Sequence, residues 1–142
     1  MAQRLRGGSP GQTRVVVVHQ PVAVSREQDV SNLLRGPEAA VRSWSAAGAD
    51  VIAGGHIHLP YVLPLHAVHA GLARKSWCVQ AGTAISTRVR AEAGNSVNVL
   101  RHGAAAQGGR SAVVERWDYE QGRLCFEQTQ SHVLDLEPLG GA

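Results

Sequence analysis

Near the middle of the chain stands the run Ala49-Asp50-Val51-Ile52-Ala53-Gly54-Gly55-His56-Ile57-His58. Its first half is apolar without alternation, which predicts a short β-strand covered on both faces. The two glycines remove Cβ atoms where the chain must turn sharply and other groups must come close. In extended backbone, His56 and His58 would present both imidazoles on the same side. The run therefore predicts a buried strand leading into a turn with a histidine pair. The alternative is a surface turn that contains two histidines by chance.

A second strand is predicted upstream, at Arg14-Val15-Val16-Val17-Val18-His19-Gln20-Pro21. Four β-branched residues in a row favour a strand, and no polar residue interrupts them. We therefore place this strand centrally in a parallel or mixed sheet. Because Pro21 cannot donate to a β-ladder, the strand ends before it and His19 lies at its carboxyl edge.

The segment between these strands predicts a crossover. Residues 22–35 favour a long loop with perhaps one helical turn, and residues 37–47 favour a helix with proline at its start and glycine after its end. Strand, helix and strand in this order form a βαβ unit with parallel strands. Sites in open α/β sheets gather outside the carboxyl ends of strands. We therefore expect His19, His56 and His58 at one edge.

Four further strands are predicted downstream, at residues 77–81, 94–100, 111–119 and 123–130. The last two form a hairpin, because a short loop ending in glycine joins them. Their alternation favours burial of Val113, Trp117 and Tyr119 against another sheet. Residues 104–109 predict a small-residue loop.

Four other side chains are weaker candidates for a site. His66 and His69 lie in a mixed segment without a nearby acidic partner, so we interpret them as exposed loop histidines. Arg88 and Arg90 would share a face in extended backbone. They could contact a phosphate, although a solvated edge is the favoured interpretation.

The composition limits the class of protein. Of 142 residues, 44% are hydrophobic and 18% are charged, which favours one soluble globular domain or part of a larger one. No apolar run approaches the ~20 residues needed to cross a bilayer, and Met1–Arg14 lacks the apolar core of a secretory signal. Cys78 and Cys125 lack metal-motif spacing and fit reduced thiols. We therefore expect a cytoplasmic protein without a membrane partner.

These motifs resemble the C-terminal half of the calcineurin-like metallophosphoesterases. The segment Val15–Pro21 resembles the strand-His-x-Pro block of that family, and Gly55-His56-Ile57-His58 resembles its G-H-x-H block. The runs Gln80-Ala81-Gly82-Thr83-Ala84 and Asn95-Ser96-Val97-Asn98-Val99 resemble the strands that follow the ligands. The resemblance covers most of the chain, from about Arg14 to about Gln130.

The resemblance implies an α/β fold of mixed β-sheets packed as a sandwich with flanking helices. It assigns residues 14–132 to the C-terminal part of the domain, residues 1–13 to a linker or loop, and residues 133–142 to a flexible tail. It also implies hydrolysis of a phosphate-ester substrate by two divalent metal ions, Mn, Fe, Zn or Ni. His19 and His56 would bind one ion and His58 the other.

The sequence departs from the family in its acidic motifs. The D-x-H, G-D-x-x-D and G-N-H-[DE] blocks of the first half of the family domain do not occur. Without their bridging carboxylates, we expect the N-terminal half to be absent and this chain to be inactive alone. Glu27 or Asp29 is a weaker alternative source of a bridge.

For the isolated chain, the three histidines are expected to bind at most one ion, weakly. The missing N-terminal half is then the expected partner, and without it the chain is expected to self-associate.

Two other classes of function remain open. One is a standalone metal- or phosphate-binding module without catalysis. The other is a nucleic-acid-binding protein, because the net charge is +3 and nearly all the positive charge is arginine. No basic tract or aromatic stacking platform accompanies these arginines, which disfavours the second class.

Overall fold

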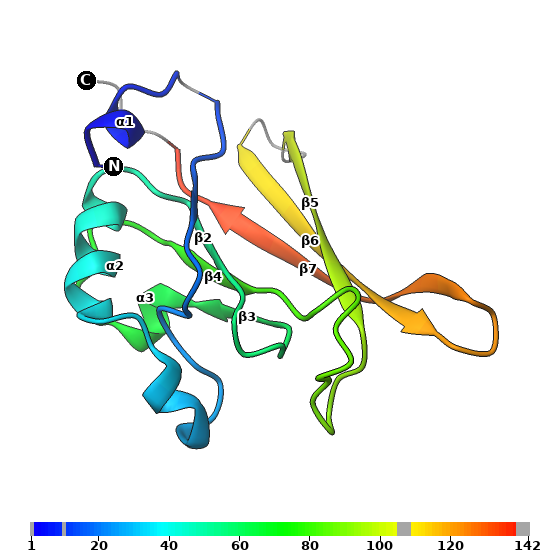
Figure 1. The fold of residues 1–142 in the computed structure, drawn as a ribbon. Helices are drawn as coiled ribbons and strands as arrows, with labels where there is room; N and C mark the ends of the chain where they lie inside the picture. The colour runs from blue at the N-terminus through cyan, green and yellow to red at the C-terminus, as the bar shows by residue number, and fades with distance from the viewer. Residues whose placement is uncertain (1, 10, 105–108, 139–142) are drawn as a thin grey trace.

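The computed structural model describes residues 2–9, 11–104 and 109–138 as a mixed α/β protein with two β-sheets (Figure 1). In chain order its elements are α1 (Ala2–Arg6), β1 (Val15–Val17), the 3₁₀ helix η1 (Glu27–Asn32), α2 (Pro37–Ala46), β2 (Val51–Gly54), β3 (Tyr61–Pro64), α3 (Leu65–Val68), β4 (Trp77–Gln80), β5 (Ser96–Ala104), β6 (Arg110–Glu120) and β7 (Cys125–Leu136). Among the described residues, no helix has the length and apolarity that a membrane crossing requires.

The first sheet has the strand order β1-β2-β4-β3. Strands β1, β2 and β4 are parallel, with Val16 opposite Ile52 and Ile52 opposite Cys78. Helix α2 connects β1 to β2, so the predicted βαβ unit is confirmed. Strand β3, antiparallel to β4, was not predicted, because its four half-buried residues lie in a segment without clear periodicity.

Strand β2 is buried on both faces, as its unbroken apolar run predicts. Ile52 packs in a cluster on the helix side with Val41 and Leu65. Val51 packs on the other side with Val79 and residues of the second sheet. In Figure 1 the helices α2 and α3 lie on one side of the first sheet and the second sheet lies on the other.

Within the described part of this chain, β1 does not have the expected central position. There it lies at the edge of the first sheet and pairs with β2 alone. Val16 is buried, whereas Val15 is 37% exposed and Val17 is 73% exposed. Four β-branched residues specify an extended backbone, but they do not specify how many neighbours the strand has. The outer ladder of β1 is therefore open.

The second sheet consists of β5, β6 and β7, all antiparallel, and includes the predicted hairpin. Its inner face carries Ala112, Val114, Leu134 and Leu136, which pack against the first sheet.

The expectation that Val113, Trp117 and Tyr119 bury the inner face is therefore wrong. An alternating strand can bury either of its two faces, and assigning the wrong face to the core interchanges the predicted buried and exposed side chains. A register irregularity between Arg116 and Trp117 then interrupts the alternation. Within the predicted loop 104–109, residues 105–108 lie outside the described part of the chain.

Both predicted ends of the domain need correction. The tail was expected to begin at 133, but residues 133–136 belong to β7, and Leu134 is fully buried opposite Ala112. Residues 139–142 lie outside the description. The expected linker 1–13 contains the short helix α1, whose Leu5 packs against the helix-side core. A single half-buried leucine in a polar, glycine-rich stretch gives no periodic signal.

A buried ionic network lies before the amino end of β2 and joins the two sheets. Asp50 is fully buried and accepts hydrogen bonds from the Arg14 backbone N–H at 2.8 Å and from Arg74 Nη2 at 2.9 Å. Arg110, at the start of β6, donates to the same carboxylate. Arg74 and Arg110 also donate to the Glu137 carbonyl, so the network fixes the end of β7.

Candidate functional site

His19 and His56 are brought together by the pairing of β1 with β2. The pairing continues past the strand ends, because Val18 N–H donates to the Ala53 carbonyl at 2.9 Å and Gly55 N–H donates to the His19 carbonyl at 3.0 Å. Each histidine therefore leaves its strand at the carboxyl edge of the sheet, beside the other. The predicted convergence is confirmed for this pair.

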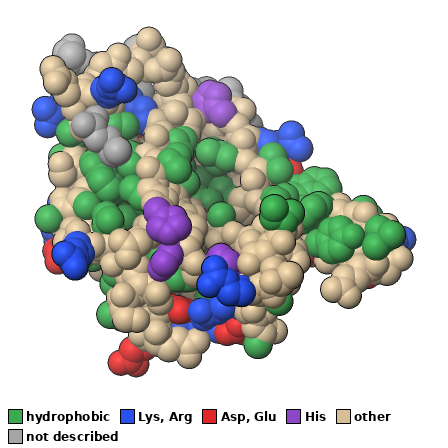
Figure 2. All heavy atoms as spheres, in the orientation of Figure 1, with side chains coloured by type: hydrophobic (Ala, Val, Ile, Leu, Met, Phe, Trp, Pro, Cys, Tyr) green, Lys and Arg blue, Asp and Glu red, His purple; other side chains and the backbone are tan. Residues whose placement is uncertain are grey.

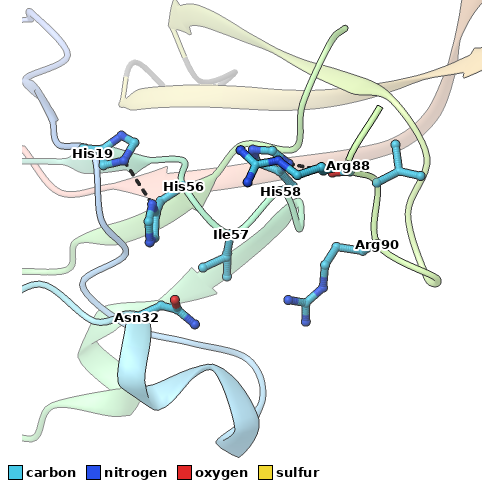
Figure 3. A pocket seen from close by; sticks show the side chains of 8 residues that line it. His19, Asn32, His56, Ile57, His58, Arg88 and Arg90 are labelled. Carbon is cyan, nitrogen blue, oxygen red and sulfur yellow. Dashed lines mark hydrogen bonds between the residues drawn. The ribbon is translucent and has the colours of Figure 1, made fainter. Parts of the chain in front are cut away.

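The two imidazoles face one another through single nitrogens. His19 Nε2 and His56 Nδ1 lie 3.0 Å apart, with ring centroids 4.8 Å apart and ring planes at 66° (Figure 3). One nitrogen donates and the other accepts. Two nitrogens bound tetrahedrally to one zinc ion, with bonds of about 2.0–2.1 Å, lie roughly 3.4 Å apart. The observed separation of the pair is therefore within a few tenths of an ångström of that of two ligands of one ion.

The backbone around Ile57 is not extended, so that part of the prediction is wrong. His56 and His58 have φ values of 71° and 56°, in the left-handed region. Ile57 between them is buried in a cluster with Leu59 and Ala93. The two imidazoles consequently diverge, His56 toward His19 and His58 toward Arg88 (Figure 3). Strained φ values held in place by packing are frequent at functional sites.

The tautomer of His58 is set by the backbone of the loop after β4. His58 Nδ1 lies 2.7 Å from the Arg88 carbonyl oxygen, which can only accept. Nδ1 therefore carries the proton and Nε2 keeps its lone pair for a ligand. Sequence reasoning missed this contact, because the two residues are 30 positions apart.

Gln80, at the carboxyl end of β4, supports the turn that leads into His56. It is fully buried, and its Nε2 donates to the Gly55 carbonyl. A Cβ at Gly54 would lie 2.6 Å from Gln80 Oε1, whereas one at Gly55 would meet nothing within 4 Å. Only the first glycine is thus required for a close approach. The sequence shows a glycine at position 54, but it does not show that Gln80 is the side chain that approaches it.

The loop after His19 is anchored by the half-buried Tyr61 and the buried Cys78. Tyr61 Oη donates to the Ala23 carbonyl at 2.8 Å, and the thiol of Cys78 lies 4.0 Å from the same oxygen. Burial is the main cause that raises the pKa of Tyr61 above its ordinary value. Burial likewise raises the pKa of Cys78 to about 12. Both groups therefore stay protonated at neutral pH and act as supports.

The histidines open into a shallow hollow on one face of the molecule. It is lined by His19, Asn32, His56, Ile57, His58, Arg88, Val89 and Arg90. Figure 2 shows histidine side chains and a group of basic side chains close together on this face. Asn32, from η1, was not among the predicted site residues.

The acidic residues of the η1 loop do not line this hollow. Both oxygens of Asp29, which is 3% exposed, accept from Arg90 at 3.1 Å. Glu27 lies at a different depression with Arg26 and Glu92. Asp29 is therefore committed to an ion pair, and Arg90 ties the η1 loop to the loop after β4.

His66 and His69 lie apart from the hollow, but the interpretation of both as exposed loop histidines is wrong, because both are half-buried. His66 belongs to α3, and its ring meets Trp77 edge to face at 5.5 Å between centroids. Within the described residues, no group of three or more His, Cys, Asp or Glu side chains is placed to hold one metal ion. The expectation that all three histidines share one ion in the isolated chain stays a prediction; the structure brings His19 and His56 together and turns His58 toward the Arg88 carbonyl.

No protein-family model matches the chain, and no curated protein matches its sequence significantly. The resemblance to the metallophosphoesterases remains a prediction, carried by the quoted motifs.

Proposed function

We propose that this chain is the C-terminal part of a metal-dependent phosphoesterase that hydrolyses phosphomonoester or phosphodiester bonds. The observation that carries the proposal is the 3.0 Å approach of His19 Nε2 to His56 Nδ1 at the carboxyl ends of two adjacent parallel strands. That edge is where α/β sheets place their sites. His19 and His56 are the proposed ligands of one ion, and His58 Nε2 is the proposed ligand of a second.

The chemistry follows from the donor set. Imidazole suits Mn, Fe, Zn and Ni, and such ions, when bound, polarise phosphoryl oxygens and lower the pKa of water. The chain itself orients the ligands: Gln80 holds the turn that carries His56, and the Arg88 carbonyl fixes the proton on His58 Nδ1. The carboxylates that would bridge two ions are proposed to come from a separate N-terminal half.

The open side of the sandwich supports a missing partner. The edge strand β1 exposes Val15 and Val17, and Leu100 of β5 is 38% exposed. Val15 and Leu100 line one shallow groove together with Thr13 and His102. Figure 2 shows hydrophobic side chains on this face between the two sheets. Open ladder edges next to apolar side chains favour addition of further strands.

Complementation tests the proposal. The chain would be assayed with bis(p-nitrophenyl) phosphate and Mn²⁺, alone and with the polypeptide encoded upstream in the same reading frame. We expect turnover only with both halves, and loss of turnover with His19→Ala. Metal-dependent turnover by the lone chain, abolished by the same substitution, would mean that this chain supplies its own bridge. No turnover by the two halves together would argue against the phosphoesterase.

A standalone metal-binding module is the second candidate. It is favoured by the formation of the His19–His56 pair within this chain alone. A zinc site of unchanged affinity with and without the second half would support it. Nucleic-acid binding gains no such support, because many of the arginines form ion pairs: Arg26, Arg42, Arg74, Arg90, Arg101, Arg110, Arg116 and Arg123.

A further inference from the structure

The loop between β4 and β5 is a fixed structure beside the histidines. Asn95 Nδ2 donates to the carbonyls of Thr83 at 3.2 Å and Ser86 at 2.9 Å. Ser86 Oγ accepts from the Arg88 backbone N–H at 3.1 Å, and the Arg88 carbonyl accepts from His58. The backbone of Arg88 is therefore held on both its N–H and its carbonyl.

The three charged side chains of this loop have different surroundings. Arg90 donates through both Nη atoms to the buried Asp29. Glu92 pairs with Arg26 and lies 3.8 Å from Arg90. Within the described residues, the Arg88 guanidinium has no hydrogen-bond or ion-pair partner. Its side chain lines the histidine hollow and extends toward His58 (Figure 3).

We infer that Arg88 binds the phosphate group of the ligand at the histidine site, whereas Arg90 only positions the loop. This inference rests on the proposed function and deepens it by separating the roles of the two arginines. A guanidinium presents parallel N–H donors that match two phosphate oxygens, and it keeps its charge at every working pH. Arg90 has already used this geometry on Asp29, so of the two arginines that line the hollow in the described structure, Arg88 is the one available to an anion.

The test is an NMR titration of the purified, metal-free chain with inorganic phosphate. We expect saturable shifts in residues 54–58 and 83–90, and an approximately fivefold or greater rise in Kd for Arg88→Gln. The Kd of Arg88→Lys should lie between those of the wild type and Arg88→Gln, because lysine keeps the charge but lacks the two parallel N–H donors. Arg123→Gln is the matched control: it removes the same charge from a side chain that is 73% exposed, and should leave the Kd unchanged.

Equal Kd values for Arg88→Gln and Arg123→Gln would overturn the inference, as would saturable shifts confined to other surfaces. A zinc titration of the same proteins separates this failure from failure of the proposed function. Zinc binding that needs His19, with phosphate binding indifferent to Arg88, would overturn the inference alone. Phosphate binding that depends on Arg88, with no zinc binding, would overturn the metal site and leave the inference standing.

Discussion

The two ends of β2 carry polar groups of opposite kinds. Just before the strand, Asp50 is fully buried, and its carboxylate accepts hydrogen bonds from the Arg14 backbone N–H and from the guanidiniums of Arg74 and Arg110. Just after the strand, His56 is exposed and its ring meets that of His19. Four residues of strand separate a charge balanced by the protein from a histidine pair turned to solvent.

This difference separates stability from function. A buried carboxylate is tolerated only when donors surround it, so the Asp50 network must be complete before the sheets can pack. Surface imidazoles need no such surrounding donors and remain available to a ligand. Substitutions at the amino end should therefore change stability, and substitutions at the carboxyl end should change binding.

The largest effect is expected for Asp50→Ala. Removing the carboxylate leaves Arg74 and Arg110 facing each other, 11% and 10% exposed, without an acidic partner. Loss of one member of a buried ion pair costs about 3–5 kcal/mol, so the free energy of unfolding in urea should fall by that amount. Glu38→Gln is the control, because its ion pair with Arg42 is exposed and should change stability little. Equal changes in the free energy of unfolding for the two substitutions would show that the Asp50 network contributes no more to stability than an exposed ion pair.

An intermediate effect is expected for Gln80→Met, which keeps the volume and removes the hydrogen bond to Gly55. The lost buried donor should lower the free energy of unfolding by about 1–2 kcal/mol. Because the Gly55 carbonyl lies next to His56, zinc affinity should fall by roughly tenfold. Urea unfolding measures the change in stability, and a zinc titration measures the change in affinity. Unchanged zinc affinity together with reduced stability would show that Gln80, like the Asp50 network, affects stability and not binding.

A smaller change in stability is expected for His56→Asn. Asparagine tolerates the left-handed φ of 71° at this position, and the side chain is exposed. The free energy of unfolding should stay within about 0.5 kcal/mol of the wild-type value. Zinc binding should be lost or greatly weakened, as it should with His19→Ala. A stability loss comparable to that of Asp50→Ala would show that the pair holds the fold together.

The sequence predicts those parts of the molecule that local chemistry determines. Val51 and Ile52 need two covered faces whatever surrounds them, and Pro21 ends β1 wherever that strand lies. The approach of His19 to His56 then follows from parallel pairing. These features were predicted because each depends on a few adjacent residues.

The remainder depends on contacts between distant segments. The edge position of β1, the choice of Val114 over Val113 for the core, and the direction of His58 are set by partners far along the chain. Alternation is symmetric, so it cannot say which face is buried. Spacing of two places His56 and His58 on one side only if the backbone is extended, and both residues instead have left-handed φ values.

The last prediction concerns thiol chemistry, which compares the two ends of β2 through one reporter. Cys78 lies in the core between them, and burial raises its pKa to about 12, whereas Cys125 is exposed. At pH 8, Ellman's reagent should therefore modify one thiol per native chain, and a second only in denaturant. Above about pH 9 the unfolded chain would release the Cys78 proton while the folded chain retains it, so stability should fall as the pH rises toward 12. Asp50→Ala should speed the slow modification by increasing the unfolded population, and His56→Asn should leave its rate unchanged. Modification of both thiols at equal rates in the native wild-type chain would contradict the burial of Cys78 and remove this distinction between the two ends.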